Sequence, residues 1–587
     1  MLTIPARPSR PGSGPGGDPA FHRAGTTVLG PRRRRRPRPR RPLLAAAVAV
    51  ALVPLAGLGL LQLWPGYLPP PSATRLVVDG YACQSPAVVD PAGRVLVPFW
   101  TVKALFAPGL TLEAETMTAV ISTRGLTIPM ASAQATEFVN RAPVDLRVPV
   151  TTDASGALYV PADFFAELLG FTFSYFPESN TVVIDRLGLT VETVTVVSSP
   201  AFLRETPSLL SLRVSRLEEG DVLRVYDHVG SWLYARDTLG RLGYIPKKAT
   251  APGPPVTNRR EERPVTLPPL GDRLCLVWEH VSTANPDPAR IGEMPGVNVV
   301  SPTWLHVMNS DGDVYNNADT AYVSWAHERG YRVWGLVTNG FSRHRTRNFL
   351  PDPALREKII RQLLIYARLY RLDGFNMDFE NMYLDQKDDY VALLRELAAV
   401  ARPEGLTLSV DVTFHSSSEV WSRCYDRAAL AEVSDFVMVM GYDQHTAGSP
   451  VSGPVGSLPW VEAGLERVIE EVPASKLVLG VPFYTRLWAE EPGRRPTVTT
   501  YSMQGVQDLI AEKGLTPVWD AAAGQNYIEF SEDGVRYRLW VEDEASMAAR
   551  VALVERYGLA GLAAWRRGFE VPEVWEVIRQ GLGLPED

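Results

Sequence analysis

Carboxyl and amide side chains alternate with apolar ones in residues 373–380. If this segment is a β-strand, Asn376, Asp378 and Glu380 point to one side, and two Phe and one Met point to the other. Polar groups on the inner side of a core strand are costly unless they are hydrogen-bonded or functional. Neighbouring carboxyl groups also oppose each other's ionisation, so one can stay protonated near neutral pH and serve as a general acid. The alternative is a solvated strand or an ion-pair network, which the flanking Phe and Met residues disfavour.

The elements that would position these carboxyl groups lie within residues 272–584. Short apolar segments alternate there with longer helical patterns. This rhythm predicts an α/β fold, a (β/α)8 TIM barrel, with the carboxyl groups at the C-terminal end of a strand. Residues 490–540 predict a small α+β insertion between the seventh and eighth strands. The predicted strands are residues 274–278, 297–301, 333–337, 374–380, 406–412, 436–442, 477–481 and 561–565.

Asp373, Asp378 and Glu380 also stand at the positions of a known motif. They match D-x-x-D-x-D-x-E, the fourth-strand signature of glycoside hydrolase family 18, which residues 272–584 resemble. Asn376 stands where many chitinases of that family have Asp. The resemblance implies the same barrel that the series of strands predicts.

Two further motifs support this resemblance. Residues 440–443 match the family's M-x-Y-D at the sixth strand, and residues 561–565 are similar to its final strand, which ends in a Trp under the sugar. Within the family, the chain is similar to spore peptidoglycan hydrolases related to cortex-lytic N-acetylglucosaminidases. The residues that carry this closer similarity are 300–304, Asn376, 441–445, 480–484 and 565–568.

The family resemblance implies retaining hydrolysis in which the substrate supplies the nucleophile. Glu380 would protonate the leaving glycosidic oxygen and later deprotonate water. Asp378 would orient the substrate's acetamido group, whose oxygen attacks the anomeric carbon, and would stabilise the positive charge that develops. Tyr442 would donate a hydrogen bond to the acetamido group, and Trp565 would form the floor of the sugar site. This chemistry needs no cofactor and no metal.

Further residues near the ends of the predicted strands are candidates for substrate binding. Asp411 falls on the polar face of the predicted fifth strand, and Asp443 belongs to the M-x-Y-D motif. For Tyr484 and Arg486, sugar binding and a structural role are equally open. Trp304 could stack on a sugar ring, although a lone Trp near a strand end more often packs in a core. The full set of predicted substrate-binding residues is Trp565, Asp443, Asn376, Met440, Asp411, Tyr484, Arg486 and Trp304, with Trp488, Asn339 and Glu279 as weaker candidates.

A basic arm and an apolar segment begin the chain. Residues 1–42 contain eleven Arg, no Lys and one acidic residue, although the net charge of the whole chain is −7. Residues 43–64 form an uncharged run of 22 residues, which is long enough to span a hydrocarbon core of about 30 Å. Because basic residues flank the cytoplasmic end of a membrane span, we expect a cytoplasmic arm, a single-pass anchor in the cell membrane and an extracytoplasmic catalytic domain. A cleaved signal peptide is the alternative, and nucleic-acid binding is not expected.

Three segments lie between the predicted anchor and the barrel. Residues 75–187 contain a duplication and resemble the N-terminal stalk-like domain of copper amine oxidases, which implies a spacer or wall-contacting role and no copper. Residues 190–248 predict short strands separated by turns and resemble a bacterial SH3-type barrel, with a passive spacer equally open. Residues 249–270 contain six Pro and predict a linker.

The motifs and the family resemblance that they carry imply an enzyme that acts on a polysaccharide. Three widely separated Cys residues predict neither a disulfide framework nor a zinc cluster. The predicted reaction is hydrolysis of β-1,4 bonds at N-acetylglucosamine in peptidoglycan or spore cortex. A chitinase is the nearest alternative, although the S-x-G-G motif of many chitinases is missing. A non-catalytic glycan-binding or spore-assembly protein is disfavoured because Asp378 and Glu380 are both present.

Overall fold

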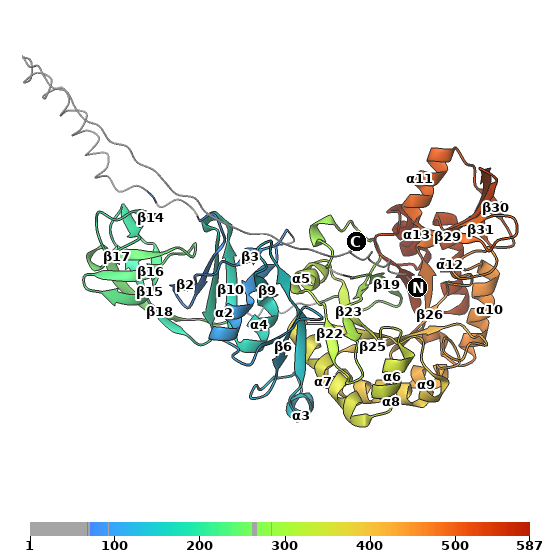
Figure 1. The fold of residues 1–587 in the computed structure, drawn as a ribbon, viewed down its shortest axis with the longest axis horizontal. Helices are drawn as coiled ribbons and strands as arrows, with labels where there is room; N and C mark the ends of the chain where they lie inside the picture. Colours follow the sequence, from blue (N-terminus) through green and yellow to red (C-terminus); the bar gives the residue numbers. More distant parts are fainter. Residues whose placement is uncertain (1–66, 68–70, 92, 261–266, 283, 587) are drawn as a thin grey trace, which may run out of the picture. The chain divides into compact units, whose positions relative to one another are not determined.

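The computed structural model of the chain describes residues 67, 71–91, 93–260, 267–282 and 284–586 (Figure 1). The predicted basic arm, residues 1–42, and the predicted membrane anchor, residues 43–64, lie outside these ranges. Among the helices within the ranges, none is both long enough and apolar enough to cross a bilayer.

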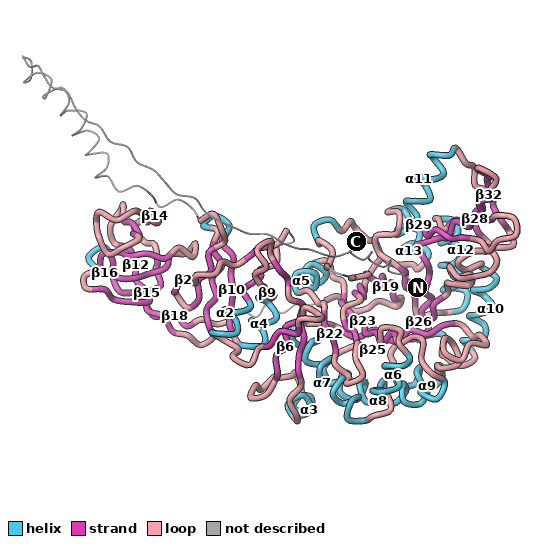
Figure 2. The backbone as a smooth tube through the Cα atoms, in the orientation of Figure 1, coloured by secondary structure: helices cyan, strands magenta, loops and turns pink. Residues whose placement is uncertain are grey.

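The eight predicted barrel strands are confirmed. They form a closed parallel barrel, because the first strand pairs with the last and the second pairs directly with the third. Figure 2 shows these strands on the inside and helices around them. In order around the barrel the strands are β19 (Leu274–Glu279), β20 (Val299–Pro302), β23 (Arg332–Thr338), β24 (Gly374–Asp378), β25 (Thr407–Thr413), β26 (Phe436–Met440), β27 (Leu477–Pro482) and β33 (Gly561–Trp565).

Helices and a hairpin complete the barrel. The longest helix, α7, begins with Pro353 at its first position and with the side chain of Asp352 accepting a hydrogen bond from the Ala354 N–H, a strong start signal. It ends at Arg371, which adopts a left-handed conformation. The elements are β21 (Leu305–Val307), β22 (Val314–Asn316), α5 (Thr320–Glu328), α6 (Arg343–Phe349), α7 (Pro353–Tyr370), α8 (Lys387–Ala401), α9 (Arg427–Val433), α10 (Leu458–Ile469), α12 (Glu544–Tyr557) and α13 (Glu573–Gly581).

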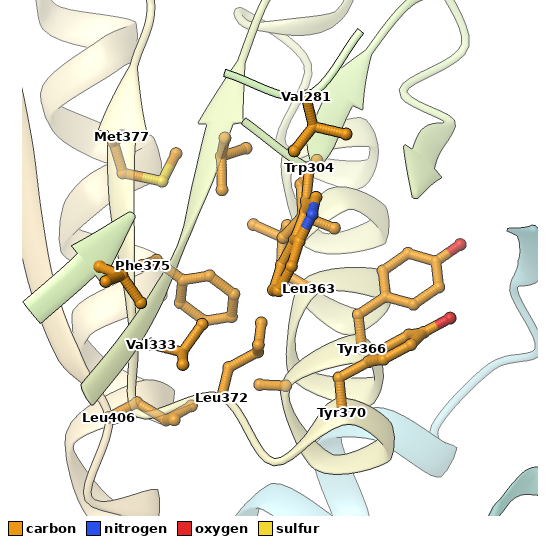
Figure 3. Packing of buried hydrophobic residues seen from close by; sticks show 14 of the residues in the cluster. Val281, Trp304, Val333, Leu363, Tyr366, Tyr370, Leu372, Phe375, Met377 and Leu406 are labelled. Carbon is orange, nitrogen blue, oxygen red and sulfur yellow. The ribbon is translucent and has the colours of Figure 1, made fainter. Parts of the chain in front are cut away.

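Apolar side chains fill both sides of the barrel wall. Trp278, Trp334 and Met438 belong to a cluster contributed by the inward-facing positions of the strands. Phe375 and Met377 of β24 belong to the outer cluster, which includes residues of α7. Figure 3 shows the ring of Phe375 on the side where Leu363, Tyr366 and Tyr370 lie. The predicted alternation is therefore confirmed for β24, whose polar residues face the interior.

The predicted α+β insertion is also confirmed, although it begins at Tyr484, before residue 490. It is a five-stranded antiparallel sheet in the order β29-β28-β32-β31-β30, with one helix packed against it. Its elements are β28 (Tyr484–Glu490), β29 (Thr497–Ser502), α11 (Met503–Lys513), β30 (Val518–Asp520), β31 (Gln525–Glu532) and β32 (Val535–Val541).

Within its described residues, the duplicated region contains three small sheets and three α-helices. One repeated pair of tripeptides, Leu96–Pro98 and Tyr159–Pro161, lies in β4 and β9, which pair with each other in antiparallel register, Val97 opposite Val160. The strands are β1 (Arg75–Val78), β2 (Tyr81–Ala82), β3 (Val88–Val89), β4 (Val95–Pro98), β5 (Thr111–Glu113), β6 (Thr118–Ser122), β7 (Asp145–Pro149), β8 (Thr151–Thr152), β9 (Leu158–Pro161), β10 (Phe171–Phe176) and β11 (Thr181–Arg186), and the helices are α2 (Phe99–Leu105), α3 (Ala133–Asn140) and α4 (Ala162–Leu169).

Residues 190–257 form a seven-stranded antiparallel sheet, and its last strand corrects a prediction. Thr250–Thr257 is strand β18, paired with β12, so a linker cannot begin at residue 249. The Pro residues were the misleading signal, because a strand at the edge of a sheet tolerates Pro. The order is β14-β13-β17-β16-β15-β12-β18. The bounds are β12 (Thr190–Val196), β13 (Ala201–Arg204), β14 (Arg213–Leu217), β15 (Val222–Val229), β16 (Trp232–Arg236), β17 (Leu242–Pro246) and β18 (Thr250–Thr257).

Tyr366 of α7 joins the duplicated region to the barrel. Its buried hydroxyl accepts a hydrogen bond from the Arg147 N–H at 2.7 Å and lies 3.2 Å from the Arg147 carbonyl oxygen and 3.1 Å from that of Val314. The Arg147 guanidinium pairs with Asp313 at 2.8 Å. Strand β7 is therefore held against the barrel by buried polar contacts.

Replacing Tyr366 with Phe should lower the free energy of unfolding by about 1–3 kcal/mol, because the buried Arg147 N–H loses its acceptor. Chemical denaturation with a fluorescence readout would measure this loss. Tyr315→Phe is the matched control, since the Tyr315 hydroxyl bonds Glu113 at a half-exposed site where water can replace it. Equal effects of the two substitutions would contradict the proposed importance of the buried contact.

Candidate active site

The predicted catalytic strand places an amide beneath its carboxyl groups. Trp278 Nε1 donates to Asn376 Oδ1 at 2.8 Å. Since an indole N–H can only donate, this bond fixes the orientation of the amide. Asn376 Nδ2 then donates to Asp411 Oδ1 at 2.7 Å and to Ser409 Oγ at 3.0 Å. Asn376 is 0% exposed, so its predicted contact with substrate is wrong, and its role is to hold Asp411.

Three carboxyl groups converge at the C-terminal ends of β24 and β25. Asp378 and Asp411 are buried, whereas Glu380 is partly exposed. Burial, reinforced by the charges of Asp378 and Asp411, raises the pKa of Glu380 well above its ordinary value. Burial also raises the pKa of Asp378, and its hydrogen bond with Glu380 opposes that rise. The group therefore retains a proton at pH values where isolated carboxyl groups have lost theirs.

Asn339, at the end of β23, fixes the backbone of Glu380. Its Oδ1 accepts from the Glu380 N–H at 3.1 Å, and its Nδ2 donates to the Glu380 carbonyl oxygen at 2.8 Å and to Thr346 Oγ1 at 2.9 Å. Asn339 is completely buried, so it does not line the mouth as expected from the sequence. It is a positioning residue for Glu380.

Asn339→Ala should lower kcat about tenfold and leave KM nearly unchanged, because a small displacement of the acid costs rate more than binding. Steady-state kinetics on a soluble glycan would separate the two constants. Asn348→Ala is the control, since the Asn348 side chain bonds Ser310 at an exposed position on the neighbouring helix. A fall in kcat/KM caused by KM alone would contradict this positioning role.

Asp373, the first residue of the motif, lies away from this group. Its Oδ2 contacts His327 Nε2 at 2.8 Å and accepts from the Val333 N–H at 2.8 Å. These partners belong to α5 and to the start of β23, and Asp373 precedes β24. Its contacts therefore tie the beginnings of two strands and a helix together, and nothing in its position gives it access to the carboxyl trio.

Tyr442 and Asp443 follow β26 on another side of the mouth. Burial raises the pKa of Tyr442, so its hydroxyl keeps its proton as a donor. Asp443 has a φ of 64° and accepts from Tyr484 Oη at 2.5 Å and from Arg486 at 2.9 Å. Tyr484 and Arg486 thus hold the half-exposed Asp443 carboxylate in place. Arg486 Nε and Nη1 are buried and have no partner within the described ranges.

Trp565 and Met440 end two further strands of the barrel. Trp565, at the end of β33, is partly exposed, and its ring centroid lies 6.1 Å from that of Trp278. Met440, at the end of β26, is also partly exposed. Trp278, which supports both Asn376 and Trp565, was not predicted from the sequence. Its inward position in β19, in phase with Leu274 and Leu276, was the available signal.

Trp304 and Trp488 do not reach the site, so their predicted sugar contacts are wrong. Trp304 is 0% exposed, donates to Asn285 Oδ1 at 2.6 Å and packs in the outer cluster (Figure 3). Trp488 is also completely buried and donates to the Gly453 carbonyl oxygen at 2.8 Å. Glu279 is buried as well and forms an ion pair with Arg567. Across the described parts of the chain, no cluster of His, Cys, Asp and Glu could hold a metal ion.

Comparison with protein families agrees with this geometry. Residues 338–570 match the family described as glycosyl hydrolases family 18, a range that includes the carboxyl trio. Residues 338–570 are therefore similar to family 18 glycosyl hydrolases. Residues 77–184 match the copper amine oxidase N-terminal domain, which fits the duplicated region.

Two curated proteins and one solved structure illustrate the similarity. The putative sporulation-specific glycosylase YdhD of Bacillus subtilis (strain 168) is 26% identical over 352 residues, 56% of this chain and 82% of that protein. The cortical fragment-lytic enzyme of the same organism is 25% identical over 255 residues, 42% of this chain and 58% of that protein. The chitinase structure from Chromobacterium violaceum ATCC 12472 is 25% identical, with a TM-score of 0.48. The match covers 53% of this chain and 100% of the chitinase chain. The family match and the curated relatives identify this chain as a glycoside hydrolase.

Proposed function

We propose that this chain is a family 18 glycoside hydrolase that cleaves β-1,4 bonds at N-acetylglucosamine in peptidoglycan or spore cortex, with retention and with the help of the substrate. The observation that carries the proposal is the carboxyl trio. Glu380 is partly exposed and has a raised pKa, whereas Asp378 lies buried beside it. An acid open to the glycan and a protected carboxylate next to it are the two groups that this reaction needs.

The acetamido group of the sugar would occupy the space between Asp378 and Tyr442. Asp378 Oδ1 has no hydrogen-bond partner within the described residues, and the substrate amide N–H would supply one. The Tyr442 hydroxyl would bond the same acetamido group. The acetamido oxygen would attack the anomeric carbon as Glu380 gives its proton to the leaving oxygen. Water activated by Glu380 would then open the cyclic intermediate and return the proton to the acid.

The choice of polymer rests on sequence similarity. The names of two curated relatives refer to sporulation and to cortical fragments, and both terms favour a bacterial wall polymer over chitin. We also propose that residues 43–64 anchor the chain in the cell membrane by a single span, with the barrel outside. The duplicated region and the seven-stranded sheet of residues 190–257, here called the small β module, would then connect the membrane to the wall. A bacterial SH3-type role for this module stays a prediction.

Product analysis tests this proposal. The purified full-length protein would be incubated separately with spore cortex, vegetative peptidoglycan and chitin oligosaccharides, and the reducing ends would be identified by mass spectrometry. New reducing-end N-acetylglucosamine from either wall polymer is the expected result. Reducing-end muramic acid would contradict the proposed bond, and cleavage of chitin alone would favour the chitinase alternative. Binding without cleavage would favour a glycan-binding protein.

The pH dependence of kcat/KM should reveal the raised pKa of the acid. Activity requires protonated Glu380, so it should fall as pH rises through that pKa, well above the value of about 4.3 for an ordinary Glu. Asp411→Asn removes one of the charges that raise the pKa of Glu380, so the falling limb should move to lower pH. Rate profiles of both proteins would measure the shift. A falling limb near the ordinary Glu value would contradict the assignment of Glu380 as acid.

A further inference from the structure

Three leucines protrude from the loop between β13 and β14. Leu209, Leu210 and Leu212 are 58%, 72% and 38% exposed. They lie in residues 205–212, here called the leucine loop. A cluster of exposed leucines on one loop marks a contact surface more often than scattered apolar residues do. Neither the glycan site nor the family matches account for it, since it lies outside both matched ranges.

Hydrogen bonds hold the leucine loop in a defined shape. The Glu205 N–H donates to the Leu212 carbonyl oxygen at 3.0 Å, which closes the base of the loop. The Thr206 N–H donates to Ser211 Oγ at 2.9 Å, and Arg204 donates to the Ser211 carbonyl oxygen at 2.9 Å. The leucines are therefore presented on a braced turn, which lowers the entropy cost of docking them.

Tyr67 lies beside the base of the same loop. It forms an isolated β-bridge with Arg213, the first residue of β14, and its ring lies edge-on to Phe202 with centroids 6.5 Å apart. The Arg213 guanidinium covers Phe202 at 4.1 Å from the ring centroid. Tyr67 is 54% exposed. An exposed Tyr, the half-buried Arg213 and a leucine-bearing turn therefore lie next to one another in the small β module.

Chain connectivity links this end of the module to the predicted membrane anchor. Only Pro65 and Gly66 separate Tyr67 from Trp64, the last residue of the predicted span. Three extended residue steps reach about 10 Å at most. If residues 43–64 cross the bilayer, Tyr67 must stay within that distance of its outer surface. The base of the leucine loop, which Tyr67 contacts, must then lie near the same surface.

We infer that the leucine loop docks into the outer surface of the bilayer that holds the anchor, so that the small β module is fixed against the membrane. This inference rests on the membrane anchor in the proposed function. Leucine side chains would enter the boundary of the acyl chains, Tyr67 would lie at the headgroup level, and Arg213 would face lipid phosphates.

Depth-dependent fluorescence quenching tests the docking in the full-length protein. Cys83→Ser would remove the partly exposed thiol, since Cys275 and Cys424 are buried. In that background, Leu210→Cys would carry an environment-sensitive fluorophore. The protein would be placed in vesicles of equal parts phosphatidylcholine and phosphatidylglycerol that contain nitroxide-labelled lipid. Val518→Cys, at a 65% exposed position of the insertion, would carry the control label. We expect several-fold stronger quenching and a blue-shifted emission at position 210.

Further outcomes distinguish docking of the leucine loop from anchoring by residues 43–64. If the protein floats with the vesicles after a carbonate wash but position 210 is quenched no more than position 518, the anchor stands and the docking is overturned. Failure to float would overturn both. A label at Ser208→Cys should lose its quenching when Leu209→Ser and Leu210→Ser are added. Shielding of position 210 from aqueous quencher by added peptidoglycan, or by a second copy of the chain, would instead assign the leucine loop to that partner and contradict docking on lipid.

Discussion

Replacing Glu380 with Gln should lower kcat about 10²–10⁴-fold, the usual contribution of a general acid. Gln has the same shape but cannot give a proton to the leaving oxygen. The position of the side chain should be retained, because the two bonds to Asn339 come from the backbone of residue 380. Binding of glycan should therefore survive. Initial rates on wall polymer and equilibrium binding to the same polymer would be measured on one preparation.

Glu328→Gln provides the matched control for this substitution. Glu328 is an exposed residue at the end of α5, so the same chemical change there should leave kcat unaltered. Undiminished hydrolysis by the Glu380→Gln protein would contradict the role of Glu380 as the general acid. A loss of binding comparable to the loss of rate would instead assign Glu380 to substrate recognition, and the proton donor would have to be sought among Asp378 and Asp411.

The strand that carries these groups was predictable because its pattern is local. Alternation with a period of two places Asn376 and Asp378 on the inner face of β24 whatever surrounds the strand. The eight barrel strands were predictable for the same reason, since each is a short apolar segment with its own boundaries. At residues 250–257 the local pattern led to a wrong prediction. A local signal, the density of Pro, indicated a linker, but pairing with β12 makes the segment an edge strand.

Roles that depend on distant partners were not predictable. Asn339 and Glu380 are 41 residues apart, and nothing local shows that the amide of one closes on the backbone of the other. Trp304 follows a strand much as Trp565 ends one, yet Trp304 packs against Tyr322 of α5 and Trp565 does not. Exposure of an aromatic residue is decided by what packs on it. The sequence motif could therefore place Trp565 at the mouth, but composition could not exclude Trp304.

The carboxyl trio also illustrates a cost that active sites impose on stability. Burial raises the pKa of Asp378, so the native state binds this proton more tightly than the unfolded chain does. Stability is then present at low pH and declines as pH rises from the ordinary Asp value of about 3.9 toward the raised native pKa. Substitution of such a group by a neutral residue should relieve this cost while removing function.

Asp378→Asn should accordingly lower kcat about 10²–10³-fold, the typical effect of losing one group that stabilises developing charge. Asn cannot balance the positive charge on the cyclised acetamido group, and Asp411 is already bonded to Asn376. At neutral pH the variant should be at least as stable as the parent, because the penalty for ionising a buried carboxyl group is gone. Kinetics and thermal unfolding of the same sample would give both quantities.

Asp373→Asn is the matched control for Asp378→Asn, because it makes the same chemical change in the same motif. Asp373 bonds His327 and the Val333 N–H below the strand, so its loss should lower stability and leave kcat nearly unchanged.

A substrate whose sugar carries a free amine in place of the acetamido group adds a second test of the mechanism. The parent enzyme should fail to cleave it, since the nucleophile is missing. Cleavage of that substrate at the normal rate would show that the acetamido oxygen is not the nucleophile, and the role of the acetamido group would have to be abandoned.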